Sequence, residues 1–198
     1  YKIAGLKTDQ IVSLKNEQLA ALTTLQVAAL KTGQLDALTT AQVDKLTSAQ
    51  VKALNATQLS ALTSSTLEVS KLTTAQLSNL NADALSGLRT DQINALDANQ
   101  LKSLTVNQVK VLSTGQLDAL TTAQVTSLTT SQVSILTTGE VAALNTTQVS
   151  VLTTGQVKAL TVPQLVSLSS AQVSALTTTQ VGALTSTQLY GLVTAARD

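Results

Sequence analysis

The chain has 198 residues, a formal net charge of +1 and only 12% charged residues. This density of positive charge argues against binding to a nucleic-acid backbone and against a polybasic membrane patch. No apolar run approaches the length that spans a bilayer, and no signal-peptide pattern opens the chain. We therefore expect a soluble chain without a membrane span, although a secretion signal could lie outside it.

The composition also lacks the residue types that carry most site chemistry. The chain has no Cys, His, Met, Trp or Phe, so zinc, copper and haem sites of the usual kind are not expected. No base is placed by a motif beside the many Ser and Thr residues. Asp36, Asp44 and Asp118 are expected to be solvated surface residues. We predict no enzyme activity, no catalytic residues, no cofactor and no metal site.

A repeat of eight residues runs through the chain. Leu recurs every eight residues from Leu6 to Leu62, then after ten residues at Leu72, and again every eight residues to Leu192, which makes 23 units. Five residues after each Leu stands Val, Leu or Ile, preceded by Gln in 20 units. The exceptions are Thr66, Ala84 and Glu140, and the consensus is Leu-Thr-Thr-x-Gln-Val-x-Ala.

The pattern predicts a single repeat array over residues 1–198. It comprises octads at 6–61, a ten-residue unit at 62–71, octads at 72–191 and an irregular C-terminal end at 192–198. The ten-residue unit is expected to lengthen one helix or to mark a kink. Because Ile3 occupies the Val position of an incomplete unit, we expect the array to be a segment of a longer one.

The period excludes one continuous helix, because eight residues advance an apolar stripe by roughly 80° per unit. Within a unit, Val125 and Leu128 are three residues apart and share a helical face. Leu120 and Val125 are five residues apart, about 140° around a helix, and do not share one. The helix must therefore end after each Leu and begin again before the next Val.

Helix caps are expected at each of these breaks. Thr121 and Gln124 have the spacing of a capping box, and every unit carries Ser, Thr, Asn or Asp at its second or third position. Where the second position is Lys or Arg, the third is expected to supply the cap, as after Lys7, Lys15, Lys31 and Arg89. The repeated Gln is interpreted as a capping residue or as a polar spine that bonds unit to unit, and we favour capping.

These features predict an all-α solenoid with one short capped helix of about six residues per unit. Burying one Leu and one Val contributes roughly 3–6 kcal/mol, against about 12 kcal/mol for ordering eight residues, so units must stack to fold. The frequent Ala at the eighth position would let neighbouring backbones approach closely. The alternative is a β-solenoid, because Thr and Val favour strands. Strands would place Leu120 and Val125 on opposite faces, and regular turn pairs such as Asn-Gly are missing.

The tracts Leu120–Val125 and Leu152–Val157 resemble the tandem repeats of very large bacterial proteins described as adhesin-like, haemagglutinin-like or haem-utilisation-or-adhesion proteins. The resemblance covers nearly the whole chain and implies an extracellular or cell-surface setting. It implies a spacer, stalk or fibre-forming scaffold, with self-association or extracellular partners. It transfers no functional residues, and no His, Met or Cys is present to ligate haem iron. The alternatives are a self-assembling filament or sheath subunit and, less favoured, an ice-binding protein.

Overall fold

The described residues form short helices joined by brief extended connections. The structure is a computed structural model that describes residues 3–60, 70 and 72–195. All regular secondary structure in these ranges is helical, so the predicted all-α fold is confirmed and the β-solenoid alternative is wrong there. The expected change of geometry at the ten-residue unit falls on residues 61–69 and 71, which lie outside the described ones.

Two compact units divide the chain, Tyr1–Leu104 and Thr105–Asp198. The first contains η1 (Ile3–Gly5), α1 (Thr8–Val12), α2 (Asn16–Ala20), α3 (Thr24–Ala28), α4 (Thr32–Asp36), α5 (Thr40–Val43), α6 (Ser48–Lys52), α7 (Ala56–Ser60), α8 (Thr74–Asn79), α9 (Ala82–Leu85), α10 (Thr90–Asn94) and α11 (Ala98–Ser103). The second contains α12 (Val106–Lys110), α13 (Thr114–Asp118), α14 (Thr122–Ser127), α15 (Thr130–Ile135), α16 (Thr138–Ala142), α17 (Thr146–Val151), α18 (Thr154–Ala159), α19 (Val162–Val166), α20 (Ser170–Ala175), α21 (Thr178–Ala183) and α22 (Ser186–Ala195).

The same backbone geometry recurs in the connections between helices and explains why most of the helices are so short. Before α14, Thr121 is extended with φ −69° and ψ 161°, and its hydroxyl accepts a hydrogen bond from the Gln124 amide. After α14, Leu128 is extended again with φ −60° and ψ 136°. The chain therefore leaves the helical conformation at Leu and re-enters it after Thr, as the period predicts.

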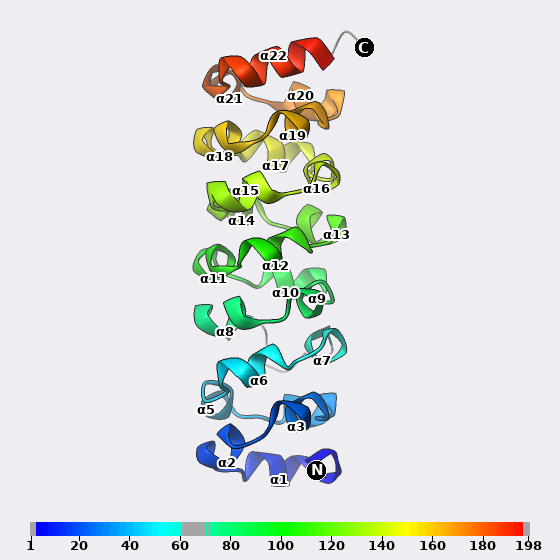
Figure 1. Ribbon diagram of the computed structural model, residues 1–198, viewed down its shortest axis with the longest axis vertical. Helices are drawn as coiled ribbons and strands as arrows, with labels where there is room; N and C mark the ends of the chain where they lie inside the picture. The colour runs from blue at the N-terminus through cyan, green and yellow to red at the C-terminus, as the bar shows by residue number, and fades with distance from the viewer. Residues whose placement is uncertain (1–2, 61–69, 71, 196–198) are drawn as a thin grey trace. The chain divides into compact units, whose positions relative to one another are not determined.

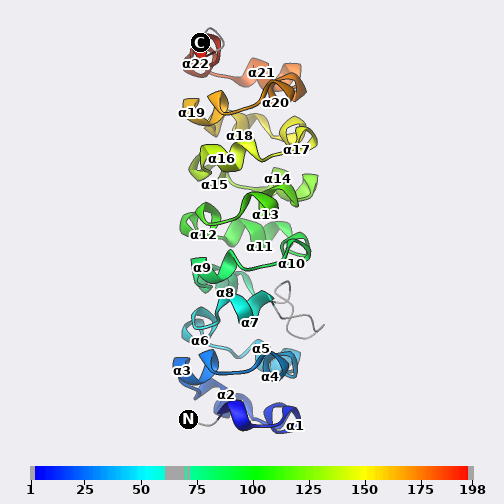
Figure 2. The same cartoon turned by 90° about the vertical axis from the view of Figure 1, so that its right-hand side faces the viewer.

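Within each unit, helices stack on helices that lie further along the chain. Helix α2 contacts α5 in the first unit, while α15 contacts α18 and α19 contacts α22 in the second. Figure 2 shows the same stacking from the side. Because the chain returns to each position after three to four octads, both units have the winding of a solenoid.

The core consists of the two apolar positions of the repeat. In most of the described octads the side chain at the Val position is completely buried, as for Val125 and Leu117, and the Leu at the start of the octad lies beside it, whereas Val173, Val181 and Leu189 are 41%, 43% and 40% exposed. Leu128, for example, is 6% exposed. Among the described residues, the other buried side chains are the repeated Gln and single cases such as Ala84, Ser127 and Glu140, so the predicted Leu stripe is part of a true core.

Candidate functional site

The repeated Gln makes the most specific polar contacts of the structure. Gln148 is the third residue of α17, and its side-chain Oε1 accepts a hydrogen bond from the Asn145 amide at 2.9 Å. In return, the Gln148 amide donates to Asn145 Oδ1 at 2.9 Å. This reciprocal pair is the capping box that the spacing predicts.

The same side chain also links successive turns. Gln148 Nε2 donates to the carbonyl oxygens of Leu117 at 2.8 Å, Asp118 at 3.0 Å and Leu120 at 2.8 Å. These carbonyls lie where α13 ends and the next connection begins, one turn earlier in the solenoid. The two interpretations of Gln are therefore both correct, because its oxygen caps its own helix while its nitrogen bonds the previous turn.

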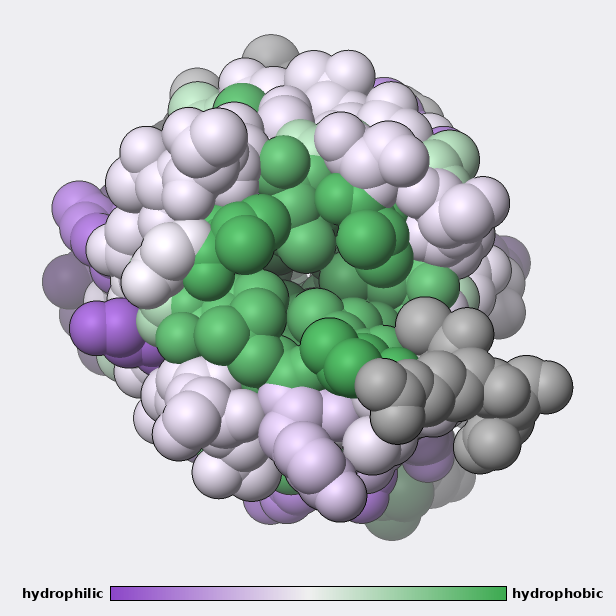
Figure 3. Space-filling model, turned by 90° about the horizontal axis from the view of Figure 1, so that it is seen from above, coloured by the Kyte–Doolittle hydropathy of each residue, from purple (hydrophilic) through white to green (hydrophobic). Residues whose placement is uncertain are grey.

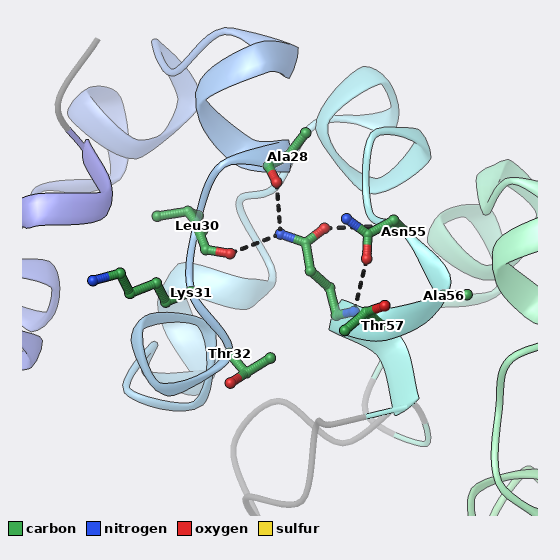
Figure 4. Close-up of a pocket in the computed structure, with 8 residues that line it drawn as sticks. Ala28, Leu30, Lys31, Thr32, Asn55, Ala56 and Thr57 are labelled. Carbon is green, nitrogen blue, oxygen red and sulfur yellow. Dashed lines mark hydrogen bonds between the residues drawn. The ribbon is translucent and has the colours of Figure 1, made fainter.

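An equivalent arrangement surrounds Gln58 in the first unit. Its Nε2 donates to Val27 and Leu30 at 3.0 Å each and lies 3.4 Å from the Ala28 carbonyl oxygen. Figure 4 shows the Ala28 and Leu30 carbonyls converging on one amide, with Asn55 on its other side. The Leu30 carbonyl thus receives a donor from the next turn, and the Val27 carbonyl, which also accepts from the Leu30 amide at 3.1 Å, receives a second one.

We call each of these inter-turn contacts a rung and the series the glutamine ladder. A rung normally joins Gln to carbonyls 31 and 28 residues earlier, as for Gln156 with Val125 and Leu128. Its Gln side chain is nearly completely buried, with Gln148 only 2% exposed. Rungs of this kind are made by Gln34, Gln42, Gln50, Gln58, Gln76, Gln92, Gln100, Gln148, Gln156, Gln164, Gln172, Gln180 and Gln188.

The ladder also locates the two additional residues of the ten-residue unit. Gln76 bonds Val43 and Gln92 bonds Leu59, in both cases 33 residues earlier. Gln100 bonds Leu72 at the ordinary separation of 28. The two extra residues therefore lie between Leu59 and Ser70 in the sequence. Gln76 and Gln92 keep their rungs across this stretch, with a separation in sequence that is two residues longer than usual.

Four units contradict the expected choice of cap. The N-caps of α1, α2, α4 and α10 are Lys7, Lys15, Lys31 and Arg89, and none accepts a side-chain hydrogen bond from its helix. Their side chains have no acceptor, and the following Thr or Asn is already the first helical residue. Only the Gln half of the capping box remains, as in the bond from the Lys7 amide to Gln10 Oε1 at 2.8 Å.

Ala84 replaces Gln in α9, and this position has no amide side chain to form a rung. Here the Asn81 side chain caps the helix through the Asp83 amide at 2.9 Å. Helix α9 packs on α7, and a Cβ added at Gly87 would lie 2.6 Å from the Ala56 Cβ. The small eighth residue therefore allows a close approach of neighbouring backbones, as the repeat predicts.

Glu140 replaces Gln in α16 and changes the chemistry of its rung. Its Oε2 accepts from the Thr137 amide at 2.6 Å, so the capping contact is kept. A carboxylate has no donor for the Val109 and Leu112 carbonyls, which occupy the acceptor positions 31 and 28 residues earlier. Glu140 is 5% exposed, and this burial raises the pKa of its carboxyl group, against the lowering effect of the Thr137 hydrogen bonds.

The other charged side chains of the described residues lie at or near the surface. Asp44 and Asp118 are exposed and Asp36 is half-buried, while Arg89 and Asp91 form an exposed ion pair at 3.0 Å. In the ranges that the structure describes, no cluster of His, Cys, Asp or Glu has the arrangement of a metal site. None of the helices described is both long and apolar enough to cross a membrane.

The fold and the ladder define a helical solenoid protein built from octapeptides. The ALTTAQ repeat family model matches residues 2–32, 27–64, 93–130, 130–162 and 163–194, and the chain belongs to this family. The matches cover 31 to 38 residues, about four to five octads, and are therefore a little longer than the 28 to 31 residues that a rung spans. No curated protein matches the sequence.

Proposed function

We propose that this array is a non-enzymatic spacer or stalk of a secreted or cell-surface bacterial protein of the adhesin-like kind. The ladder carries the proposal, because the same buried rung recurs between Gln34 and Gln100 in the first unit and between Gln148 and Gln188 in the second, where it joins a turn to the one before it. A structure held together by identical neighbour contacts sets a length and presents a repeated surface. These are mechanical properties of a scaffold.

The surface supports the same function. The positions that face outward are mainly Thr, Ser, Ala and short polar residues, as in Thr121, Thr122 and Ala123 of α14. They recur with little change from octad to octad, so a contact made by one octad can be repeated along the array. Repetition multiplies weak contacts into avidity.

The proposed location rests on the resemblance to adhesin-like repeats and on the composition. A chain without Cys has no thiol to form mispaired disulfides during export, and its short polar surface suits an extracellular setting. We therefore expect the array to lie outside the cell, between parts of a larger protein that it keeps apart.

Labelling of intact producing cells tests this proposal. Antibodies raised against the folded array should bind without permeabilisation, and electron microscopy should show the label at a distance from the envelope that decreases when whole turns are deleted. The matched control deletes a segment of equal length outside the array. Label found only after permeabilisation would contradict the location, and a label distance independent of repeat number would contradict the spacer function.

A further inference from the structure

The Gln side chain of a rung fills a space between two successive turns. In the Gln58 rung, Oε1 accepts a hydrogen bond from the Asn55 amide at 3.0 Å. Nε2 donates to the carbonyls of Val27 and Leu30, both at 3.0 Å. The primary amide therefore lies between one main-chain donor on its own turn and two main-chain acceptors on the preceding turn. The rungs thus define a set of main-chain groups that recognises a CONH₂ group.

Helix α9 keeps these main-chain groups but lacks the amide, because Ala84 stands at the Gln position. The rung before it and the rung after it each bond a carbonyl 33 residues earlier, and the first also bonds one 30 residues earlier. The same separations from Ala84 lead to the carbonyls of Val51 and Leu54. The corresponding donor is the Asn81 amide, three residues before Ala84.

The main-chain groups that face Ala84 have free hydrogen-bonding capacity. Among the described residues, no group donates to the Leu54 carbonyl and none accepts from the Asn81 amide. The Val51 carbonyl accepts from the Leu54 amide at 3.2 Å and keeps one lone pair for a second donor. The Asn81 side chain is engaged elsewhere, since its Oδ1 accepts from the Asp83 amide at 2.9 Å.

A cavity of about 300 Å³ lies beside these groups, and its lining includes Leu54, Asn81 and Ala84. Leu54 and Ala84 are buried, whereas Lys52 and Asn81 are exposed, so the cavity has a closed inner end and opens to solvent. Its inner end borders the apolar interior. Figure 3 shows such an interior at the end of the second unit, where apolar residues gather inside a polar rim. The volume is at the lower end of the range for small-molecule sites.

We propose that this cavity, which we call the Ala84 site, binds a short primary amide. Relative to Gln, Ala84 lacks one methylene and the terminal amide, and these atoms together correspond to acetamide. The NH₂ group of acetamide donates to the Leu54 and Val51 carbonyls, and its oxygen accepts from the Asn81 amide. Its methyl group contacts Ala84, so a short alkyl group is selected. The Ala84 site does not depend on the proposed spacer function.

Titration of the full chain with acetamide, followed by NMR of ¹⁵N-labelled Asn residues, tests the site. Selective labelling limits the spectrum to a few amides, and Asn81→Ser identifies the Asn81 signal by its loss. This signal should move downfield and saturate with a Kd on the order of 10 mM. The Asn145 signal is an internal control and should not move, because Gln148 already accepts from this amide at 2.9 Å. Acetate is the matched probe, since it has the same shape but no N–H donor, and should give no saturable shift.

Two substitutions exchange the occupied and the open state of a rung. Ala84→Gln should form a rung, raise the urea midpoint of unfolding and abolish the acetamide shift at Asn81. Gln148→Ala removes the amide between Asn145 and the Leu117 and Leu120 carbonyls. In this variant the Asn145 signal should become sensitive to acetamide. Circular dichroism verifies that both variants remain helical.

Four results would each contradict the inference. The wild type could show no saturable shift at Asn81, or acetate could produce the same shift as acetamide. The shift could persist in Ala84→Gln, which would place the bound amide elsewhere. Finally, Ala84→Gln could lower the urea midpoint, which would show that the cavity has no room for an amide group.

Discussion

At the scale of single residues, Glu140 differs from the Gln residues of the ladder in one group: it has a carboxylate oxygen where Gln has an NH₂ group. We expect Glu140→Gln to raise the free energy of unfolding by about 1–3 kcal/mol near neutral pH, because it supplies a donor to the Leu112 carbonyl and a second donor to the Val109 carbonyl, which already accepts from the Leu112 amide. Urea unfolding of the full-length wild type and of the full-length Glu140→Gln variant, followed by circular dichroism, measures the difference in the free energy of unfolding.

The pH dependence of this substitution has a defined sign. Burial raises the pKa of Glu140 in the folded chain above its ordinary value, so ionisation favours unfolding and the wild type loses stability as pH rises through that pKa. Helices α13 and α19 contact α16, and their charged residue, Asp118, is exposed, as is Lys110 between the Val109 and Leu112 acceptor positions. The gap between wild type and Glu140→Gln should therefore be small near about pH 4 and large near about pH 7. A gap of equal size at both pH values would contradict an ionisable rung.

The reverse substitution in an intact rung is the matched experiment. Gln148→Glu should lower the free energy of unfolding by about 1–3 kcal/mol at neutral pH, because it removes the donor for the Leu117 and Leu120 carbonyls. The control is Gln18→Glu, since Gln18 caps its helix but donates to no earlier turn, and its effect on the monomer should stay below about 0.5 kcal/mol. Equal effects at the two positions would show that rungs contribute nothing beyond capping.

The sequence predicts half of what the Gln residue does. Thr and Gln three residues apart identify the capping box, because both partners are local. The second function needs a partner about thirty residues away, and a period of eight gives no information on which octads become neighbours. For the same reason, the sequence shows that Glu140 departs from the Gln pattern, but it does not show that a hydrogen-bond donor to the previous turn is missing there.

At the scale of the helix, the burial of the Leu stripe can be measured directly. Leu128→Ala should lower the free energy of unfolding by roughly 2–5 kcal/mol, because Leu128 is a core residue. Thr122→Ala should cost under about 1 kcal/mol, since Thr122 is exposed and Thr121 still caps α14. Chemical denaturation gives both values, and equally small losses would mean that the stripe is not the core.

Close approach of the backbones can be tested with two glycines. Gly87→Ala should destabilise by about 1–3 kcal/mol, because its Cβ would lie 2.6 Å from Ala56 and the helices would have to shift. Gly33→Ala has open space around its Cβ, so it should be neutral or stabilise by up to about 1 kcal/mol. Thermal melts of the two variants should differ in sign, and a neutral Gly87→Ala would show that α7 and α9 can separate freely.

Helix positions were predictable because the break and the period are encoded locally. The Leu and the apolar residue five positions later cannot share one helical face, so the chain must leave the helix at each Leu, as Leu128 shows. The cap identities at Lys7 and Arg89 were predicted wrongly, because the position of the cap is fixed by the register of the apolar residues and the Gln side chain. A better capping residue one position later does not move the helix start.

At the scale of the whole molecule, the distance between rung partners sets a minimum number of repeats. Gln34 lies in the fourth complete octad and bonds Ile3 in the unit before the first, so a peptide of one or two octads contains no rung. Such peptides should show no helical signal in water, and cooperative unfolding should begin at about five octads and become more stable with each addition. A folded two-octad peptide would contradict the stacking argument.

The uniform spacing of the ladder also bears on how the gene can change. Apart from those of Ala84 and Glu140, the described octads offer the same donor and the same acceptors, so the loss or gain of a whole octad by replication slippage leaves the remaining Gln side chains with carbonyls to bond. The stretch between Leu59 and Ser70 shows that even two extra codons are accepted, since Gln76, Gln92 and Gln100 still reach their carbonyls. We therefore expect the number of octads to change without loss of the fold, so that selection can act on the length of the array.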